Sequence, residues 1–395
     1  MTGEIEGGEV MRAEDIKKVS VIGAGQMGSG IAEVALIAGY RVSLRDIREG
    51  LVKQGVALID ESLRKLISKK LVSEKQYNRI TKELLHTSVD LEEALRDADL
   101  VIEAVPEDLS LKKQVFRDLD KFSPKRAIMA TNTSTMSVTE ISLATKRPEN
   151  VFGLHFFNPP VLMKLVEVIK GDHTSEETMR TGYRFCLKID KIPVRVEKDI
   201  PGFIVNRVQA PSGALLGAMV DRGIATPEEI DALIRKQGKP MGPFELLDFT
   251  GIDISYNARN YFAKAISPDL APFKLMKAKV QAGEYGKKTG RGFYDWSKGR
   301  PEIDLSKATD KLDPKDVLAV QINEATKLIE WGIATSEDID KAILNGTGNT
   351  KGPMEEAQQF TPEDLTARLE RLSKEFKKKI FEPTKMIREG GYLKS

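Results

Sequence analysis

The chain has 395 residues, of which 41% are apolar and 30% are charged, enough to bury large cores in two or three domains. Its 61 Lys and Arg residues are mixed with 59 Asp and Glu residues, so we expect neither nucleic acid nor a membrane surface as the main partner. A single cysteine, Cys186, excludes an internal disulfide and a cysteine metal cluster, and no metal site is expected.

The chain carries no apolar stretch that predicts export or membrane insertion. Its first residues, Met1–Glu9, are acidic and lack the apolar core of a secretory signal. No later segment approaches the roughly 20 apolar residues that span a bilayer. These features predict a cytoplasmic protein.

Residues 13–199 have the pattern of an α/β domain. Short runs rich in β-branched residues alternate with longer runs of helical period, as in βαβ units around a parallel sheet. We therefore expect a doubly wound, Rossmann-type domain with strands near 19–22, 41–44, 99–102, 127–130 and 151–154. The stretch from Gly50 to Glu83 predicts a helical hairpin inserted before a further strand near His86.

A dinucleotide fingerprint directly follows the first expected strand. The run Gly23–Gly28 has glycine at its first, third and last positions and opens a helix, the context in which such a turn binds a pyrophosphate. Asp46 ends the second strand, where a carboxylate accepts hydrogen bonds from the adenosine ribose and repels a 2′-phosphate. This favours NAD over NADP, although Arg45 and Arg48 could instead hold a 2′-phosphate or be solvated surface charges.

Three histidines are candidates for the proton acceptor, a role for which imidazole is well suited near neutral pH. His86 lies at a strand edge and His173 in a polar turn, so both are expected to be structural or exposed. His155 ends an apolar strand, where the strand ends of a doubly wound sheet face the ligand. A core histidine is the alternative, but Glu167 in another apolar strand needs a buried partner, and a His155–Glu167 pair satisfies both.

The second half of the chain predicts helices only, in two copies. After Pro201 apolar residues recur at helical spacing. The run Gly223–Asp231 matches Gly332–Asp340, and each copy then reaches a Gly-Pro pair, which indicates a duplication. We expect a helical domain at 200–296, a polar linker at 297–313 and a second helical domain at 314–395 that packs back on the first.

The chain resembles the 3-hydroxyacyl-CoA dehydrogenases over its whole length. Besides the nucleotide fingerprint, the motifs that carry the resemblance are Asn132–Thr135, His155–Pro159, Leu165–Val168, Pro201–Arg207 and Lys288–Tyr294. The resemblance implies NAD-dependent conversion of a 3-hydroxyacyl-CoA thioester to its 3-oxo partner and the reverse reduction. It also implies helical domains like the C-terminal domain of 6-phosphogluconate dehydrogenase.

The resemblance implies that His155 and Glu167 are the catalytic pair. Ser134 and Asn206 are then expected to hydrogen-bond the substrate oxygen or to hold His155, a polarising role where negative charge develops. From the residues alone, Ser134 could merely cap a turn and Asn206 could cap or bridge helices.

Cofactor and substrate contacts follow from the same resemblance. Glu107 and Lys112 are expected near the nicotinamide, with a helix N-terminal acid and a surface lysine as the alternatives. Ser62 and Lys69 on the inserted hairpin match positions that contact coenzyme A, although they could form a solvated helix face. The full expected cofactor set is Gly23, Gly25, Gln26, Met27, Gly28, Asp46, Glu107, Lys112 and Asn132.

The duplicated helical domain resembles the dehydrogenase part of multifunctional fatty-acid oxidation proteins and of chains fused to an enoyl-CoA hydratase. Short relatives pair as dimers, so the second copy is expected to take the place of a partner subunit, in a monomer or a homodimer. Aligning Gly223 with Gly332 puts Lys315 at the position of Asn206, which assigns the chemistry to the first copy.

Two other functions remain open at this point. One is a dehydrogenase of a 3-hydroxy acid without coenzyme A, as in the related 3-hydroxyisobutyrate and gulonate dehydrogenases. The other is a non-catalytic relative, since the family also resembles a lens crystallin. The presence of Ser134, His155, Glu167 and Asn206 weighs against a purely structural role.

Overall fold

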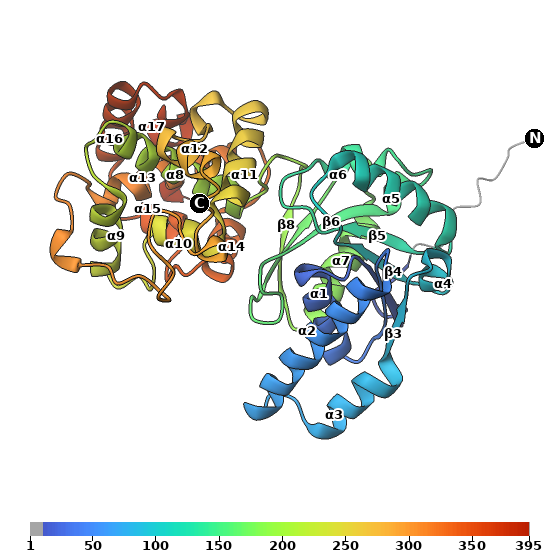
Figure 1. The fold of residues 1–395 in the computed structure, drawn as a ribbon. Helices are drawn as coiled ribbons and strands as arrows, with labels where there is room; N and C mark the ends of the chain where they lie inside the picture. Colours follow the sequence, from blue (N-terminus) through green and yellow to red (C-terminus); the bar gives the residue numbers. More distant parts are fainter. Residues whose placement is uncertain (1–10, 395) are drawn as a thin grey trace, which may run out of the picture. The chain divides into compact units, whose positions relative to one another are not determined.

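The computed structural model describes residues 11–394 and divides into two compact units, up to Phe203 and from Ile204 onward (Figure 1). The acidic segment Met1–Glu9 lies outside the described residues. Within the described part, no helix is both long and apolar enough to cross a bilayer. Each unit is described below by itself.

The first unit is built on one eight-stranded sheet in the order β3-β2-β1-β4-β5-β6-β7-β8. Neighbouring strands are parallel except for the antiparallel pair β6 and β7. The order reverses at β1, which lies between β2 and β4, and in such sheets ligands bind outside the carboxyl ends of the strands at this point. The strands are β1 (Lys18–Ile22), β2 (Arg41–Arg45), β3 (Leu85–Ser88), β4 (Leu100–Glu103), β5 (Ile128–Thr131), β6 (Val151–Phe156), β7 (Leu165–Ile169) and β8 (Ile192–Val196).

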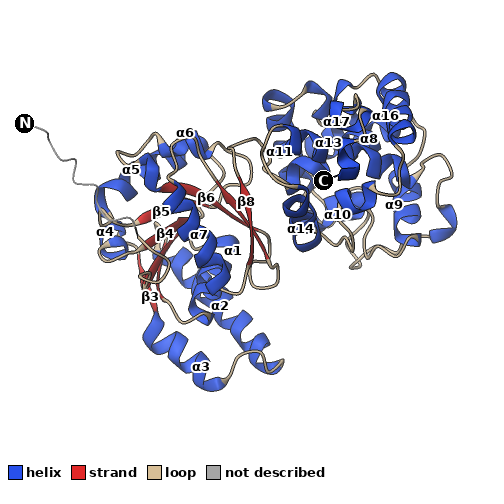
Figure 2. Ribbon diagram, turned by 180° about the vertical axis from the view of Figure 1, so that it is seen from behind, coloured by secondary structure: helices blue, strands red, loops and turns tan. Residues whose placement is uncertain are grey.

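Helices cover both faces of this sheet, as Figure 2 shows with the strands in red. Side chains that alternate along β4 separate into two cores: Leu100 and Ile102 join the side chains of α1 and α7, and Val101 joins those of α4, α5 and α6. The helices of this unit are α1 (Gln26–Ile37), α2 (Glu49–Ser68), α3 (Glu74–Arg79), α4 (Leu91–Leu95), α5 (Leu109–Phe122), α6 (Val138–Ser142) and α7 (Glu176–Lys188), and a π-helical turn, η1 (Ile80–Leu84), follows α3. The inserted hairpin predicted at 50–83 is therefore α2, α3 and η1.

The second unit is helical and carries the predicted duplication. Helix α8 (Val205–Asp221) and helix α13 (Pro314–Glu330) have 17 residues each, start 109 residues apart and pack against each other. The other helices are α9 (Pro227–Lys236), α10 (Pro243–Thr250), α11 (Ile252–Ala265), α12 (Lys274–Gln281), α14 (Ser336–Gly346), α15 (Pro353–Ala357), α16 (Pro362–Phe376) and α17 (Lys385–Arg388).

The same helix-capping interaction occurs in both copies. The Asp231 carboxylate accepts hydrogen bonds from the first backbone amides of α10, and the Asp340 carboxylate does the same for α15. The segment 297–313 is not a loose tether, because Ile303 and Leu312 are buried and the segment hydrogen-bonds the backbone of α9. Residues 204–395 thus form one unit, and domain boundaries at 296 and 313 stay predictions.

Candidate active site

A tight turn joins β1 to α1 and leaves the first amides of the helix uncapped. Gly23 has φ +107°, and a Cβ on it would come within 2.5 Å of the Ala104 carbonyl oxygen. A Cβ on Gly28 would lie 1.8 Å from the Gly23 oxygen, whereas one on Gly25 would meet nothing within 4 Å. No side chain caps α1 at Gly25. The turn therefore offers open space and unpaired amides at a helix N-terminus, which suits a pyrophosphate.

Asp46 stands beside this turn, directly after β2. Its Oδ2 accepts a hydrogen bond of 2.7 Å from the Ala24 amide, and its Oδ1 accepts one from the Ile47 amide. The side chain is partly exposed. Of the two neighbouring arginines, Arg45 donates to the Val89 carbonyl and Arg48 immediately precedes α2. A carboxylate fixed at the edge of the glycine turn fits the ribose of an adenine dinucleotide.

A buried charge cluster lies where β4 and β5 end. The Lys112 ammonium, on α5, is 2.7 Å from Glu103 Oε1 and 3.3 Å from Glu107 Oε2, and its side chain is 1% exposed. Glu103 also accepts a hydrogen bond of 2.7 Å from the Thr131 hydroxyl. The alternative of a surface lysine at position 112 is therefore wrong.

Glu107 accepts hydrogen bonds from the loop that follows β5. Its Oε1 accepts hydrogen bonds from the Thr133 hydroxyl at 2.6 Å, from the Ser134 amide at 2.9 Å and from the Thr135 amide at 3.1 Å. Burial raises the pKa of Glu107, but Lys112 and these hydrogen bonds together hold it below its ordinary value. The Ser134 hydroxyl is 3.3 Å from the same oxygen. Glu107, Lys112 and Ser134, all of them predicted site residues, thus lie together in one cluster.

The next strand end is connected to this loop. Asn132 Oδ1 accepts a hydrogen bond of 2.9 Å from the Phe156 amide, so the residue after β5 is tied to the last residue of β6. Gln26, which begins α1, donates to Asn158 Oδ1 at 3.2 Å. Met27 follows Gln26 in the first turn of the same helix.

His155 and Glu167 form a buried pair. They lie directly opposite each other in the antiparallel register of β6 and β7, and His155 Nδ1 is 2.6 Å from Glu167 Oε2. The exposed fraction is 8% for the His155 side chain and 0% for Glu167. The ring centroids of Phe157 and Phe203 are 4.5 Å and 5.8 Å from that of His155. The imidazole is therefore held by a carboxylate and packed against two aromatic rings.

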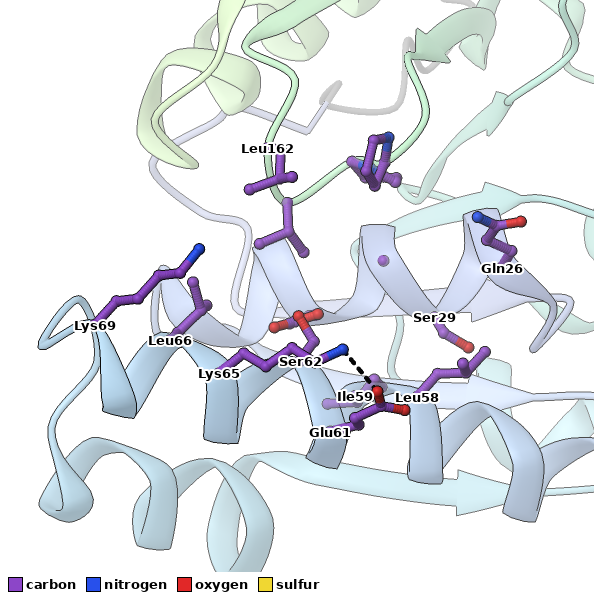
Figure 3. Close-up of a pocket in the computed structure, with 15 residues that line it drawn as sticks. Gln26, Ser29, Leu58, Ile59, Glu61, Ser62, Lys65, Leu66, Lys69 and Leu162 are labelled. Carbon is purple, nitrogen blue, oxygen red and sulfur yellow. Dashed lines mark hydrogen bonds and ion pairs between the residues drawn. The ribbon is translucent and has the colours of Figure 1, made fainter. Parts of the chain in front are cut away.

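A pocket of about 330 Å³ adjoins the nucleotide turn. Ser62 and Lys65 enter it from α2 and Lys69 from the position directly after that helix, and Leu162 lies across from them (Figure 3). Gln26 lies at one end of the pocket and Lys69 at the other. Ser62 and Lys69 thus line one cavity, and their contact with coenzyme A remains a prediction.

Asn206 belongs to the second unit, as the second residue of α8. Its assignment to the substrate oxygen remains a prediction. Two residues that were not predicted from the sequence also lie at these sites, Glu103 in the charge cluster and Glu33 on the pocket wall. Each left a signal, because each is a single acid in an otherwise apolar strand or helix.

Residues 18–200 match the NAD binding domain of 3-hydroxyacyl-CoA dehydrogenase, and its C-terminal domain matches twice, at 202–296 and 315–391. A 3-hydroxybutyryl-CoA dehydrogenase from Clostridioides difficile is 40% identical over 287 residues, which are 71% of this chain and 100% of that protein.

Two further relatives give the same result. The mitochondrial hydroxyacyl-coenzyme A dehydrogenase of Sus scrofa is 40% identical over 288 residues, or 71% of this chain and 91% of that one. The crystal structure of 3-hydroxybutyryl-CoA dehydrogenase from Escherichia coli K12 superimposes with a TM-score of 0.86 at 29% identity, covering 96% of this chain and 98% of that one.

Proposed function

Because the chain belongs to the 3-hydroxyacyl-CoA dehydrogenase family and contains that family's NAD binding domain, we propose that it oxidises (S)-3-hydroxyacyl-CoA to 3-oxoacyl-CoA. The substrates include 3-hydroxybutyryl-CoA, and the enzyme also catalyses the reverse reduction. His155 is the acid and base in both directions. The observation that carries this proposal is the buried hydrogen bond between His155 and Glu167.

His155 takes the proton of the substrate hydroxyl. Its Nδ1 faces Glu167, so the carboxylate fixes the tautomer and directs Nε2 to the substrate. When bound, NAD supplies the nicotinamide ring that accepts the hydride from the same carbon. Glu167 stabilises the imidazolium that forms, because a buried positive charge needs a partner. In the reduction, the imidazolium returns the proton to the developing alkoxide.

Ser134 and Asn206 are assigned to the substrate oxygen. Ser134 lies in the loop that Glu107 holds after β5, and a hydroxyl so fixed can donate to an oxygen on which negative charge develops. The Glu103, Lys112 and Glu107 cluster positions the nicotinamide side of the cofactor site.

The rest of the cofactor site comes from the turn and its surroundings. Gly23, Gly25, Gly28, Gln26 and Met27 bind the pyrophosphate side and Asp46 binds the ribose, which favours NAD over NADP. Asn132 fixes the strand end between the cofactor and His155.

The pocket beside α2 supports a thioester of coenzyme A as substrate. The pantetheine arm of coenzyme A is long and narrow, and Ser62 on α2 and Lys69 directly after it bind the polar groups and phosphates of coenzyme A. A small 3-hydroxy acid without coenzyme A would leave this pocket unoccupied. The helical second copy is proposed to replace a partner subunit, because α13 packs on α8.

The test is a rate measurement with purified protein and acetoacetyl-CoA, in parallel with NADH and NADPH, followed by the loss of absorbance of the reduced nicotinamide. Oxidation of NADH at a rate well above that of NADPH is expected. No oxidation of either would contradict the proposed reaction, and equal rates would contradict the role of Asp46.

A further inference from the structure

Glu33 is a buried acid on the wall of the pocket beside α2. It lies in the middle of α1, its exposed fraction is 2%, and it lines the pocket together with Ser62 and Lys69. Its Oε1 makes no hydrogen bond within residues 11–394. A buried polar atom without a partner is costly, so such an atom on a side chain that lines a cavity points to a ligand that supplies the partner.

The surroundings of Glu33 favour its neutral form. Burial raises its pKa from 4.5 to about 7, and a hydrogen bond from the Ser62 hydroxyl opposes this rise only in part. A carboxylic acid, unlike a carboxylate, can both donate and accept a hydrogen bond.

Other charges in the pocket do not neutralise this acid. Among the described lining residues the remaining charged side chains are Glu61 and Lys65 on α2 and Lys69 directly after it. Lys65 is engaged by Glu61, with Nζ and Oε1 2.6 Å apart. The loop 159–162 contributes only apolar and proline side chains, and no charged side chain of β1, β2 or η1 lines the pocket in the part of the chain that the structure describes.

We propose that Glu33 is a substrate-binding residue that, as a neutral carboxylic acid, hydrogen-bonds an amide group in the pantetheine arm of the acyl-CoA. This inference rests on the proposed function, since it takes the acyl-CoA to lie in this pocket. The acid proton on Oε1 donates to the amide carbonyl, while the other carboxyl oxygen accepts from the Ser62 hydroxyl, so that both oxygens of Glu33 are paired in an otherwise largely apolar wall.

A pH dependence of binding follows from this contact. A ligand that needs the neutral acid binds best below pH 7, and its dissociation constant rises as the carboxylate forms. From pH 6.5 to pH 8.5 we expect an increase on the order of tenfold. Binding above pH 7 should also take up a proton from the buffer.

The experiment is calorimetric titration of the full chain with acetoacetyl-CoA at several pH values and in buffers of different ionisation enthalpy. The matched variant is Glu33→Gln, whose amide has the same shape and hydrogen-bonding capacity but does not titrate. We expect proton uptake and a pH-dependent affinity in the native chain, and neither effect from this site in the variant. Glu33→Leu should weaken binding roughly tenfold at pH 6.5 while leaving NADH affinity unchanged.

The outcomes separate this inference from the proposed function. If native protein neither binds nor reduces acetoacetyl-CoA, the proposed function fails. If it does both, but native protein and Glu33→Gln have the same pH dependence and proton uptake, the role of Glu33 is wrong and the function stands. Acetoacetyl-pantetheine, which lacks the nucleotide, should show the same difference between the two proteins, and its absence would overturn the assignment to the pantetheine arm.

Discussion

At the scale of single residues, the candidate active site depends on carboxylates buried in strands. Glu167 in β7 and Glu103 at the end of β4 are both 0% exposed, and each faces a basic side chain, His155 or Lys112. A buried carboxylate without such a partner would be protonated or would destabilise the fold. The sheet itself places His155 opposite Glu167, whereas Lys112 reaches Glu103 from α5, and the candidate catalytic histidine has little freedom to move.

His155→Gln is expected to lower kcat roughly 100- to 10,000-fold with little change in NADH affinity. Glutamine keeps a polar group of similar length but cannot transfer the proton. Steady-state rates with acetoacetyl-CoA and a separate titration with NADH measure the two effects.

His86→Gln is the matched control, because His86 lies exposed in the edge strand β3. It should retain native rates. A parallel loss of NADH binding in His155→Gln would indicate that His155 supports the fold and not the chemistry.

Asp46→Ser is expected to raise the KM for NADH roughly tenfold and to relax the rejection of NADPH. The variant loses the charge that repels a 2′-phosphate, although it also loses the hydrogen bond to the Ala24 amide. Rates with both cofactors at saturating acetoacetyl-CoA provide the measurement. An unchanged preference for NADH would remove Asp46 from the ribose site.

The residues that the sequence predicted best are those whose chemistry conflicts with their surroundings. His155 and Glu167 are polar residues in apolar strands, and that conflict by itself predicts the pair seen in the structure. Glu33 carries the same signal within an apolar helix, but helices often expose one side, so the sequence does not tell a buried acid from a solvated one.

At the scale of elements, the loop between β6 and β7 is held by one lysine. Lys191, just before β8, is 6% exposed, and its ammonium donates to the Pro160 carbonyl at 2.5 Å and to the Met163 carbonyl at 2.8 Å. Burial, together with nearby Lys164, lowers the pKa of Lys191 to about 8. The loop it holds also forms one wall of the pocket.

Lys191→Met should raise the KM for acetoacetyl-CoA several-fold and leave the KM for NADH nearly unchanged. The variant leaves two carbonyls without their donor, so the pocket wall loosens while the glycine turn stays intact. Lys164→Met is the control, because Lys164 is half-exposed and pairs with Asp190 outside the pocket. Equal changes in both Michaelis constants would argue for a general loss of structure.

Strand positions could be predicted from the sequence, but not all strand directions. The expected strands at 19–22 and 151–154 fall within β1 and β6, because buried parallel strands are continuous apolar runs. Such runs do not encode direction, so the antiparallel pairing of β6 with β7 had to come from the structure. That pairing is what places His155 opposite Glu167.

At the scale of the second unit as a whole, the two copies are joined by an ion pair that is not repeated at the equivalent positions of the duplication. Arg207 of α8 binds Glu324 of α13, and both side chains are buried. By the 109-residue spacing, the equivalents of these residues are Asp316 and Leu215, which cannot form the same pair. The repeat could be predicted from the sequence, whereas this asymmetric contact could not.

Glu324→Leu is expected to lower the free energy of unfolding by about 3–5 kcal/mol, because Arg207 is left buried without its partner. Adding Arg207→Met should recover much of the loss. Urea unfolding followed by far-UV circular dichroism measures both variants.

Glu337→Leu removes one partner of an exposed pair with Lys341 and should cost less than about 1 kcal/mol. If Glu324→Leu is as mild as this control, the buried pair does not stabilise the association of the two copies.

The placement of α8 and α13 on one chain also affects how the protein can change by mutation. In two identical subunits, every substitution at such a contact appears on both sides at once and must suit both. Here each side is encoded separately, and Lys315 stands where the first copy has Asn206. The second copy is thus free to drift towards a supporting role, and a library of variants in α13 should tolerate changes that the matching positions of α8 reject.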